Sequence, residues 1–319
     1  MLLRCLGLGL LLATRTFAAD DAPSSAEAEA KVEAPRPVAS TLELQVELHR
    51  RGFSCGSIDG GAGPQTTAAL RAFQRGAGIS DSGVLDDATK DSLRLTAPAL
   101  GEYTFTAPEL AALRAVPATW LEKSELPILG YASALELAAE RFHAHPGLIR
   151  RLNPKVNWAF VLAGTKITVP WVDRVVVKGA AAQIVITLGS RELEVLDQVS
   201  RVIAHFPVSI ARMVEKRPVG DLHVVVVIPD PNYTFDPDVF PESAEAKTLG
   251  RRLLIPPGPN NPVGLVWIGL DRPGYGIHGT PEPEKVGRTE SHGCFRLANW
   301  DALTLEGIVS AGMPVTVEP

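Results

Sequence analysis

The most restrictive feature of the sequence is a change in hydrophobic periodicity at about Arg174. Before this point, apolar residues recur near helical spacing, as in the run Leu42 to Leu48, which Gly52 is expected to end. After it, short β-branched runs, beginning with Val175-Val176-Val177, are predicted to be strands and are separated by glycine and by charged residues, as at Gly189-Ser190-Arg191. The pattern predicts a multi-domain protein with a helical N-terminal part and a mostly-β C-terminal domain that contains one helix, from Trp300 to Val309.

Length and composition support several globular domains and exclude some classes of function. The 319 residues are too many for one ordinary domain, and 45% of them are hydrophobic. A net charge of −5 argues against a nucleic-acid-binding protein. The 3 cysteines include no C-x-x-C pair, so neither a disulfide framework nor a structural zinc site is expected. Outside the extreme N-terminus no apolar run is long enough to predict a membrane span.

The N-terminal segment is predicted to direct export. Residues 1–18 combine an early Arg4, a short apolar run and the small-x-small exit Thr16-Phe17-Ala18, which is typical of a secretory signal peptide. An uncleaved anchor is the alternative, although Arg15 interrupts the apolar run early. Residues 19–40 are rich in Ala, Glu and Pro and are predicted to be a disordered tether. With no cysteine at the exit for lipidation, we expect a periplasmic protein rather than one on a Gram-positive surface.

Residues 41–95 are predicted to form a small three-helix module. A glycine-rich turn contains Asp59 and leads into Thr66, and Asp86 precedes the third helix; both Thr66 and Asp86 are expected to be N-caps. The turn, the downstream Phe73-Gln74 and the sequence Gly83-Val84-Leu85-Asp86 together resemble the peptidoglycan-binding family one domain. The resemblance implies that this module binds the cell wall.

Two further stretches precede the β-rich domain. Residues 96–124 contain three prolines and are predicted to be a linker with a short central helix. Residues 125–170 are predicted as strand, helix, helix, strand, and the Leu152-Asn153-Pro154 sequence after the second helix resembles the LysM carbohydrate-binding module. The usual Gly-Asp-Thr-Leu is replaced by Ala132-Ser133-Ala134-Leu135, which puts glycan binding in doubt. A plain helical spacer is the alternative.

The residues that carry chemistry are concentrated near the C-terminus. One cluster is Ile277-His278-Gly279-Thr280, and the other runs from Ser291-His292-Gly293-Cys294 to Arg296 and Asn299. A thiol needs a base or a positive environment to become a nucleophile, and His278 is close enough in sequence to fold back against Cys294. Three other interpretations remain: a disulfide between Cys55 and Cys294, a zinc site at His278, His292 and Cys294, and an inert buried thiol.

These clusters resemble the motif of the L,D-transpeptidases, the YkuD-type β-sandwich of bacterial cell walls. In that family a histidine is followed, after a variable gap, by Ser/Thr-His-Gly-Cys, here His278 and Ser291 to Cys294. The resemblance covers residues 173–318. It implies a catalytic domain that needs no metal and no organic cofactor.

The resemblance also implies a role for each matching residue. Cys294 is expected to be the nucleophile, His278 the general base, and the Gly279 carbonyl the group that orients the imidazole. His292 is expected to help catalysis beside the nucleophile. Substrate binding is expected to involve Arg296, Ser291 and Gly293; a structural role in the loop is an equal alternative for Arg296.

The implied reaction acts on peptidoglycan tetrapeptide stems. A Cys294 thioester forms with release of D-Ala, and the side-chain amine of a second stem then gives a 3→3 cross-link. The same thioester can meet water, as in an L,D-carboxypeptidase, or the lysine of a lipoprotein, as in a protein-anchoring enzyme. The non-enzymatic alternative is a wall-binding scaffold whose catalytic domain is inactive. Stem peptides and glycan are the expected partners, and nucleic acid is not.

Overall fold

The computed structural model describes residues 35–239, 245–289 and 293–319, all of which belong to one unit, Val32–Pro319. The predicted signal peptide, most of the predicted tether, Ser291 and His292 lie outside the described residues. Within the described ranges, no helix has both the length and the apolar character needed to cross a membrane.

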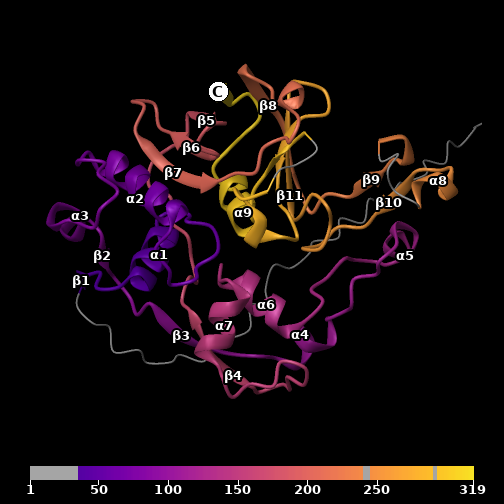
Figure 1. The fold of residues 1–319 in the computed structure, drawn as a ribbon, viewed down its shortest axis with the longest axis horizontal. Helices are drawn as coiled ribbons and strands as arrows, with labels where there is room; N and C mark the ends of the chain where they lie inside the picture. Colours follow the sequence, from indigo (N-terminus) through magenta and orange to yellow (C-terminus); the bar gives the residue numbers. More distant parts are fainter. Residues whose placement is uncertain (1–34, 240–244, 290–292) are drawn as a thin grey trace, which may run out of the picture. The chain divides into compact units, whose positions relative to one another are not determined.

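Residues 36–95 form a helical module, which confirms the prediction of a helical N-terminal part (Figure 1). Two buried glutamines hold its turns together. Gln45 donates to Asp59 Oδ1 at 2.9 Å and to Thr66 Oγ1 at 3.1 Å. Gln74 donates to the Val84 carbonyl at 2.9 Å. The module contains α1 (Thr41–Arg50), α2 (Pro64–Ala77), α3 (Asp87–Ser92) and the antiparallel pair β1 (Arg36–Pro37) and β2 (Arg94–Leu95).

The two predicted N-caps differ in outcome. Asp86 caps α3, because its side chain accepts a hydrogen bond from the Thr89 amide. Thr66 does not cap α2, because Gly63 is the N-cap and the helix begins at Pro64. Proline is favourable at the first position of a helix, where its missing N–H would have no partner within the helix. Thr66 is instead buried inside the first turn, where its hydroxyl meets Gln45.

The segment predicted as a linker contains regular structure. Strand β3 (Leu100–Thr104) pairs antiparallel with β4 (Lys166–Pro170), so the strand that partners β4 lies before residue 125. The helices between them are α4 (Ala107–Ala111), α5 (Trp120–Ser124), α6 (Ala134–Arg141) and α7 (Pro146–Leu152). Residues 125–170 therefore contain two helices and one strand. Their assignment as a LysM-like module stays a prediction.

The C-terminal part is mostly β, as predicted. Its main sheet has 8 strands in the order β13-β12-β11-β8-β14-β5-β6-β7. Strand β8 pairs with β11 through Val224 to Pro229 and with β14 through Gly220 to His223, so one long strand belongs to both halves. The sheet strands are β5 (Gln183–Thr187), β6 (Glu192–Leu196), β7 (Val202–Pro207), β8 (Gly220–Pro229), β11 (Val266–Leu270), β12 (Gly276–His278), β13 (Phe295–Arg296) and β14 (Pro314–Glu318).

One hydrophobic core joins both halves of this sheet. It contains Ile184 and Phe206 from one half and Ile268 and Phe295 from the other, so the sheet curls around its own apolar face. Helix α9 (Asn299–Glu306) packs against β11 and β12 and contributes Leu305 to the same core. The predicted helix at 300–309 is therefore present, with a slightly earlier start. The predicted strand at 175–177 is absent, and Val176 donates instead to the Arg50 carbonyl at 2.8 Å.

A small hairpin lies beside this sheet. Strands β9 (Tyr233–Phe235) and β10 (Leu253–Ile255) pair antiparallel, and α8 (Ala246–Leu249) lies in the connection between them. Three short 3-10 helices complete the regular structure described, at Val214–Lys216, Pro237–Val239 and Pro283–Lys285.

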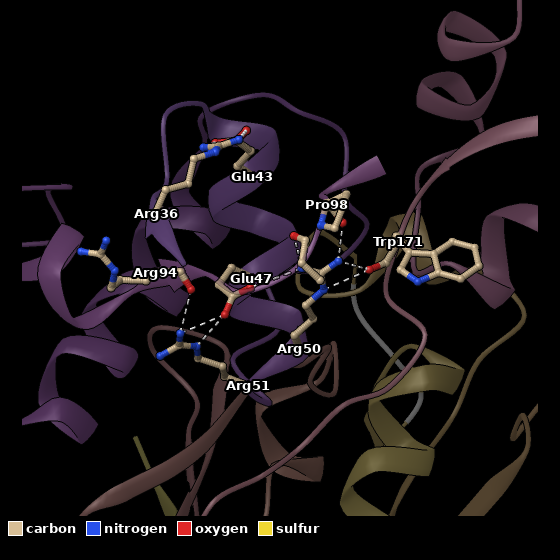
Figure 2. Close-up of polar contacts among 9 residues, drawn as sticks. Arg36, Glu43, Glu47, Arg50, Arg51, Arg94, Pro98 and Trp171 are labelled. Carbon is tan, nitrogen blue, oxygen red and sulfur yellow. Dashed lines mark hydrogen bonds and ion pairs between the residues drawn. The ribbon is translucent and has the colours of Figure 1, made fainter. Parts of the chain in front are cut away.

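The helical module is joined to its neighbours by backbone and buried side-chain contacts. The Ser54 amide donates to the His205 carbonyl at 2.8 Å, so the turn after α1 covers β7, the last strand of the sheet order. On the other side of α1, the Arg50 guanidinium donates to the carbonyls of Pro98 and Trp171, each at 2.6 Å (Figure 2). Because it is buried and bonded to several carbonyls, this guanidinium holds the segment before β3 close to the segment after β4.

Candidate active site

The fold brings together the described residues of the two predicted sequence clusters. Strands β12 and β13 run parallel, with Ile277 opposite Phe295 and His278 opposite Arg296. Cys294 immediately precedes β13, so it lies at the end of the strand that neighbours His278. Both side chains line one cavity of about 880 Å³. A cavity of this size accommodates a ligand as large as a short peptide.

His278 is buried and held on two sides. Its side chain is only 6% exposed, and its ring stacks on Trp267 with the centroids 5.6 Å apart. Its Nδ1 lies 2.6 Å from the Gly279 carbonyl oxygen. A carbonyl oxygen only accepts, so Nδ1 carries the proton and Nε2 of the neutral ring is left as the acceptor. Burial lowers the pKa of His278 to about 4, although the bond to Gly279 opposes this shift.

Cys294 is a partly buried thiol. Burial raises its pKa above the ordinary range, and a backbone hydrogen bond from Gly276 opposes the shift only in part. Its Sγ donates to the Gly274 carbonyl at 3.5 Å. The site therefore combines a protonated thiol with a neutral imidazole. A thiol in this state becomes a nucleophile only when it loses its proton to a base.

Of the other predicted site residues, Arg296 lines the cavity. Arg296 is half-buried in the cavity wall, its backbone pairs with Ser209 at 2.9 Å, and its guanidinium reaches Thr289 Oγ1 at 3.5 Å. Burial lowers the pKa of Arg296. Gly293 is described and adjoins Cys294. Ser291 and His292 lie outside the described residues, so their roles stay predictions.

Several aromatic residues of the cavity were not predicted from the sequence. Trp120 comes from α5, within the stretch expected to be a linker, and Tyr233 comes from β9. No sequence signal links a lone tryptophan in a proline-containing stretch to a histidine more than 150 positions away. The other residues that line the cavity are Ile228, Pro231, Asn232, Thr234, Pro262, Val263, Trp267 and Gly274.

Two of the alternative interpretations concern a disulfide and a metal ion. Cys55 and Cys294, the two cysteines in the described part of the chain, are both present as thiols. Among described residues, no group of three or more His, Cys, Asp or Glu side chains is arranged to hold a metal ion. The alternative zinc site included His292, which this observation does not cover.

Two segments of the sequence match known families. Residues 181–317 match the YkuD family, described as the L,D-transpeptidase catalytic domain. Residues 39–93 match the family described as "Putative peptidoglycan binding domain". Neither family match includes residues 94–180, which hold α4 to α7.

Curated relatives carry similar names. The chain is 27% identical over 185 residues to "Putative L,D-transpeptidase YkuD" of Bacillus licheniformis, an alignment that covers 58% of this chain and 93% of the relative. It is 25% identical over 184 residues to the protein of the same name from Bacillus subtilis, covering 57% and 92%.

Solved structures are more distant. An L,D-transpeptidase from Mycobacterium smegmatis is 18% identical with a TM-score of 0.35, and the match covers 50% of this chain and 65% of that one, just under two thirds. The family matches and the curated relatives together identify an L,D-transpeptidase catalytic domain of the YkuD family at residues 181–317 and a peptidoglycan-binding domain at residues 39–93.

Proposed function

We propose that the protein is an exported cysteine L,D-transpeptidase that forms 3→3 cross-links between peptidoglycan stems. One observation carries the proposal: Cys294 shares a cavity with a neutral His278 whose Nδ1 proton is bound by the Gly279 carbonyl, leaving Nε2 as the acceptor. The carbonyl does what a carboxylate does in a Ser-His-Asp triad, since it fixes both the tautomer and the orientation of the ring.

The first half of the reaction acylates the thiol. The Cys294 proton passes to His278 Nε2 as Sγ attacks the carbonyl carbon at the L-centre of the third stem residue. A C–S bond forms, the C–N bond to D-Ala breaks, and the imidazolium returns its proton to the departing amine. Backbone N–H groups next to Cys294, which follows the small residue Gly293, are suited to bind the oxyanion.

The second half transfers the acyl group. The side-chain amine of a second stem attacks the thioester carbon, a C–N bond forms, and the amine gives a proton to His278. The C–S bond breaks, and His278 passes that proton to the departing sulfur, which restores the thiol. We assign the Arg296 guanidinium to a stem carboxylate, because it lies in the cavity wall and its planar fork matches a carboxylate. Ser291 and Gly293 are assigned to substrate binding, and His292 to stabilising the tetrahedral state beside the nucleophile.

The other domains are assigned to delivery and retention. The signal peptide at residues 1–18 would export the chain to the periplasm, and the tether at residues 19–40 would follow it. The peptidoglycan-binding domain would hold the enzyme on its polymeric substrate and raise the local concentration of stems. A LysM-like module at 125–170 would add contact with the glycan.

The test is mass spectrometry of purified disaccharide-tetrapeptide incubated with the protein from residue 19 onward. We expect a dimer that lacks one D-Ala with the wild-type protein and none with Cys294→Ala, because only the thiol forms the acyl-enzyme. Cys55→Ala is the matched control, and it should leave the products unchanged, since Cys55 is buried away from the cavity.

Each other result has a defined meaning. Free tripeptide without dimer would replace the proposal by an L,D-carboxypeptidase. Conversion only when a lysine-bearing lipoprotein is added would replace it by a protein-anchoring transpeptidase. No conversion, combined with binding to isolated sacculi, would leave the wall-binding scaffold.

A further inference from the structure

The first turn of α9 is a contact surface for the N-terminal part of the chain. Three consecutive residues each meet a different partner. Asn299 donates to the Glu140 carboxyl group, Trp300 stacks on His143 with centroids 5.3 Å apart, and Asp301 accepts from the Ser54 hydroxyl at 3.0 Å. Glu140 is the last buried residue of α6, outside the catalytic domain. The turn begins only five residues after Cys294, so these contacts adjoin the catalytic cluster.

Asn299 connects this surface to the loop around the catalytic histidine. Its side chain is fully buried and all its polar atoms are used. Nδ2 donates to Glu140 and, at 3.1 Å, to the Pro259 carbonyl, while Oδ1 accepts from the Leu265 amide at 3.2 Å. Because a carboxyl oxygen accepts the amide protons, Glu140 helps to determine which end of the amide faces Leu265.

The Asn299 amide also packs directly against the backbone of Gly279. A Cβ atom at Gly279 or at Gly264 would overlap Asn299 Oδ1, so both positions leave no room for a side chain. Gly279 supplies the carbonyl that binds His278 Nδ1 at 2.6 Å. The position of the Asn299 amide therefore limits the position of that carbonyl. A displacement of either one changes the bond that orients the imidazole.

We propose that Glu140 is a positioning residue: through Asn299 it holds the Gly279 carbonyl against His278, so that the active site depends on α6. The inference deepens the proposed function and rests on His278 being the general base. It gives residues outside the matched catalytic domain a direct part in building the site. Loss of the Glu140 acceptor would leave one Nδ2 proton of a buried amide unsatisfied, which favours movement of the amide.

The choice of variants follows from the chemistry of the buried carboxyl. Burial raises the pKa of Glu140 to about 8, so the neutral acid predominates at neutral pH. Glu140→Gln has the same shape as that acid and retains an acceptor oxygen. Glu140→Met fills a similar volume without an acceptor. Ser54→Ala is the matched control, because it removes a contact to the same turn of α9 on the side that does not touch Gly279.

The first measurement requires no substrate. In protein labelled with ¹⁵N-histidine, the Nδ1 proton of His278 should give a downfield-shifted resonance, assigned by its absence in His278→Gln. We expect this resonance to be displaced or lost in Glu140→Met and retained in Glu140→Gln and Ser54→Ala. Retention in Glu140→Met, or equal loss in Ser54→Ala, would overturn the inference. Because no turnover is involved, this result is independent of which reaction the enzyme catalyses.

The second measurement is the rate of D-Ala release at a temperature well below unfolding. We expect kcat to fall about tenfold in Glu140→Met with KM within about twofold of wild type, since a misoriented base affects the chemical step more than binding. Glu140→Gln should restore the rate. A Glu140→Met protein with wild-type kcat, or a Glu140→Gln protein as impaired as Glu140→Met, would contradict the proposal.

Discussion

Burial shifts the pKa values of His278 and Cys294, the base and nucleophile of the proposed reaction, in opposite directions. It lowers the pKa of the imidazole to about 4 and raises the pKa of the thiol. Both groups are therefore neutral around pH 7, and the imidazole can accept a proton throughout that range. A cysteine activated beforehand as a thiolate beside an imidazolium would need the reverse shifts.

This difference predicts the acid limb of the activity. Protonated His278 cannot accept the thiol proton, so kcat/KM should fall as pH drops toward about 4, well below the ordinary histidine value of about 6.5. The measurement is kcat/KM for disaccharide-tetrapeptide between pH 3.5 and 7.5, values that bracket both of these pKa values. Rates measured after return to pH 7 separate inhibition from unfolding. An acid limb centred near the ordinary value would show that the buried, neutral imidazole is not the base.

The motif around His278 and Cys294 can be recognised in the sequence, whereas the contact through which we propose that Glu140 positions His278 cannot. His278 and Cys294 lie in short clusters that match a family motif, although their residue types alone also allowed a disulfide, a zinc site or an inert thiol. The contact between Glu140 and Asn299 joins positions 159 residues apart in the chain, and a glutamate on a helix is usually a solvated one. Only the packing of α6 against α9 reveals that this glutamate is buried.

At the scale of elements, α5 and the β9–β10 hairpin stabilise each other at the edge of the cavity. Trp120 stacks on Phe235 with centroids 4.5 Å apart. The Glu245 carboxylate accepts from the amides of Trp120 and Leu121 at 2.7 and 2.8 Å, which satisfies two N–H groups at the start of the helix. In Figure 1, α5 lies next to β10, although the two elements are far apart in the sequence.

This contact predicts local loosening in Trp120→Ala. Loss of the stacked pair costs about 1 kcal/mol in addition to the free energy of burying the indole, and Trp120 is one of the residues packed against the small core that the hairpin forms. We expect faster amide hydrogen exchange in β9 and β10, with exchange in β5 to β7 unchanged. Trp171→Ala is the matched control, since Trp171 packs on Phe142 away from the cavity. Equal protection of the hairpin in wild type and Trp120→Ala would show that α5 does not support it.

The elements themselves were predicted unevenly. The β-rich domain was evident because alternation over five or six residues distinguishes a strand from a helix. The pair β3–β4 was missed in part, since β3 lies among prolines and only β4 follows an obvious turn. Strand β3 is defined by its hydrogen bonds to a partner more than 60 residues later, which a local pattern does not contain.

At the scale of the whole described unit, the peptidoglycan-binding domain and the catalytic domain share buried surface. One hydrophobic cluster contains Leu48, Phe53 and Phe73 from the helical module together with Val202 from β7. The Phe53 and His205 backbones also form an isolated parallel bridge. This buried, apolar interface differs from the interface between two domains that are joined only by a linker, which is small and polar. They imply that the two domains unfold together.

Calorimetry can test this coupling by comparing the same change, phenylalanine to alanine, at a buried and at an exposed position. We expect the protein to unfold in a single transition, which Phe53→Ala moves as a whole to lower temperature, because removing a buried phenylalanine costs about 3 kcal/mol. For a unit of this size that is a shift of several degrees. Phe160→Ala makes the same change at a side chain that is 78% exposed, so it should leave the transition in place. Two transitions, with only the first displaced by Phe53→Ala, would mean that the peptidoglycan-binding domain folds separately and that its contact with β7 contributes little to the stability of the active site.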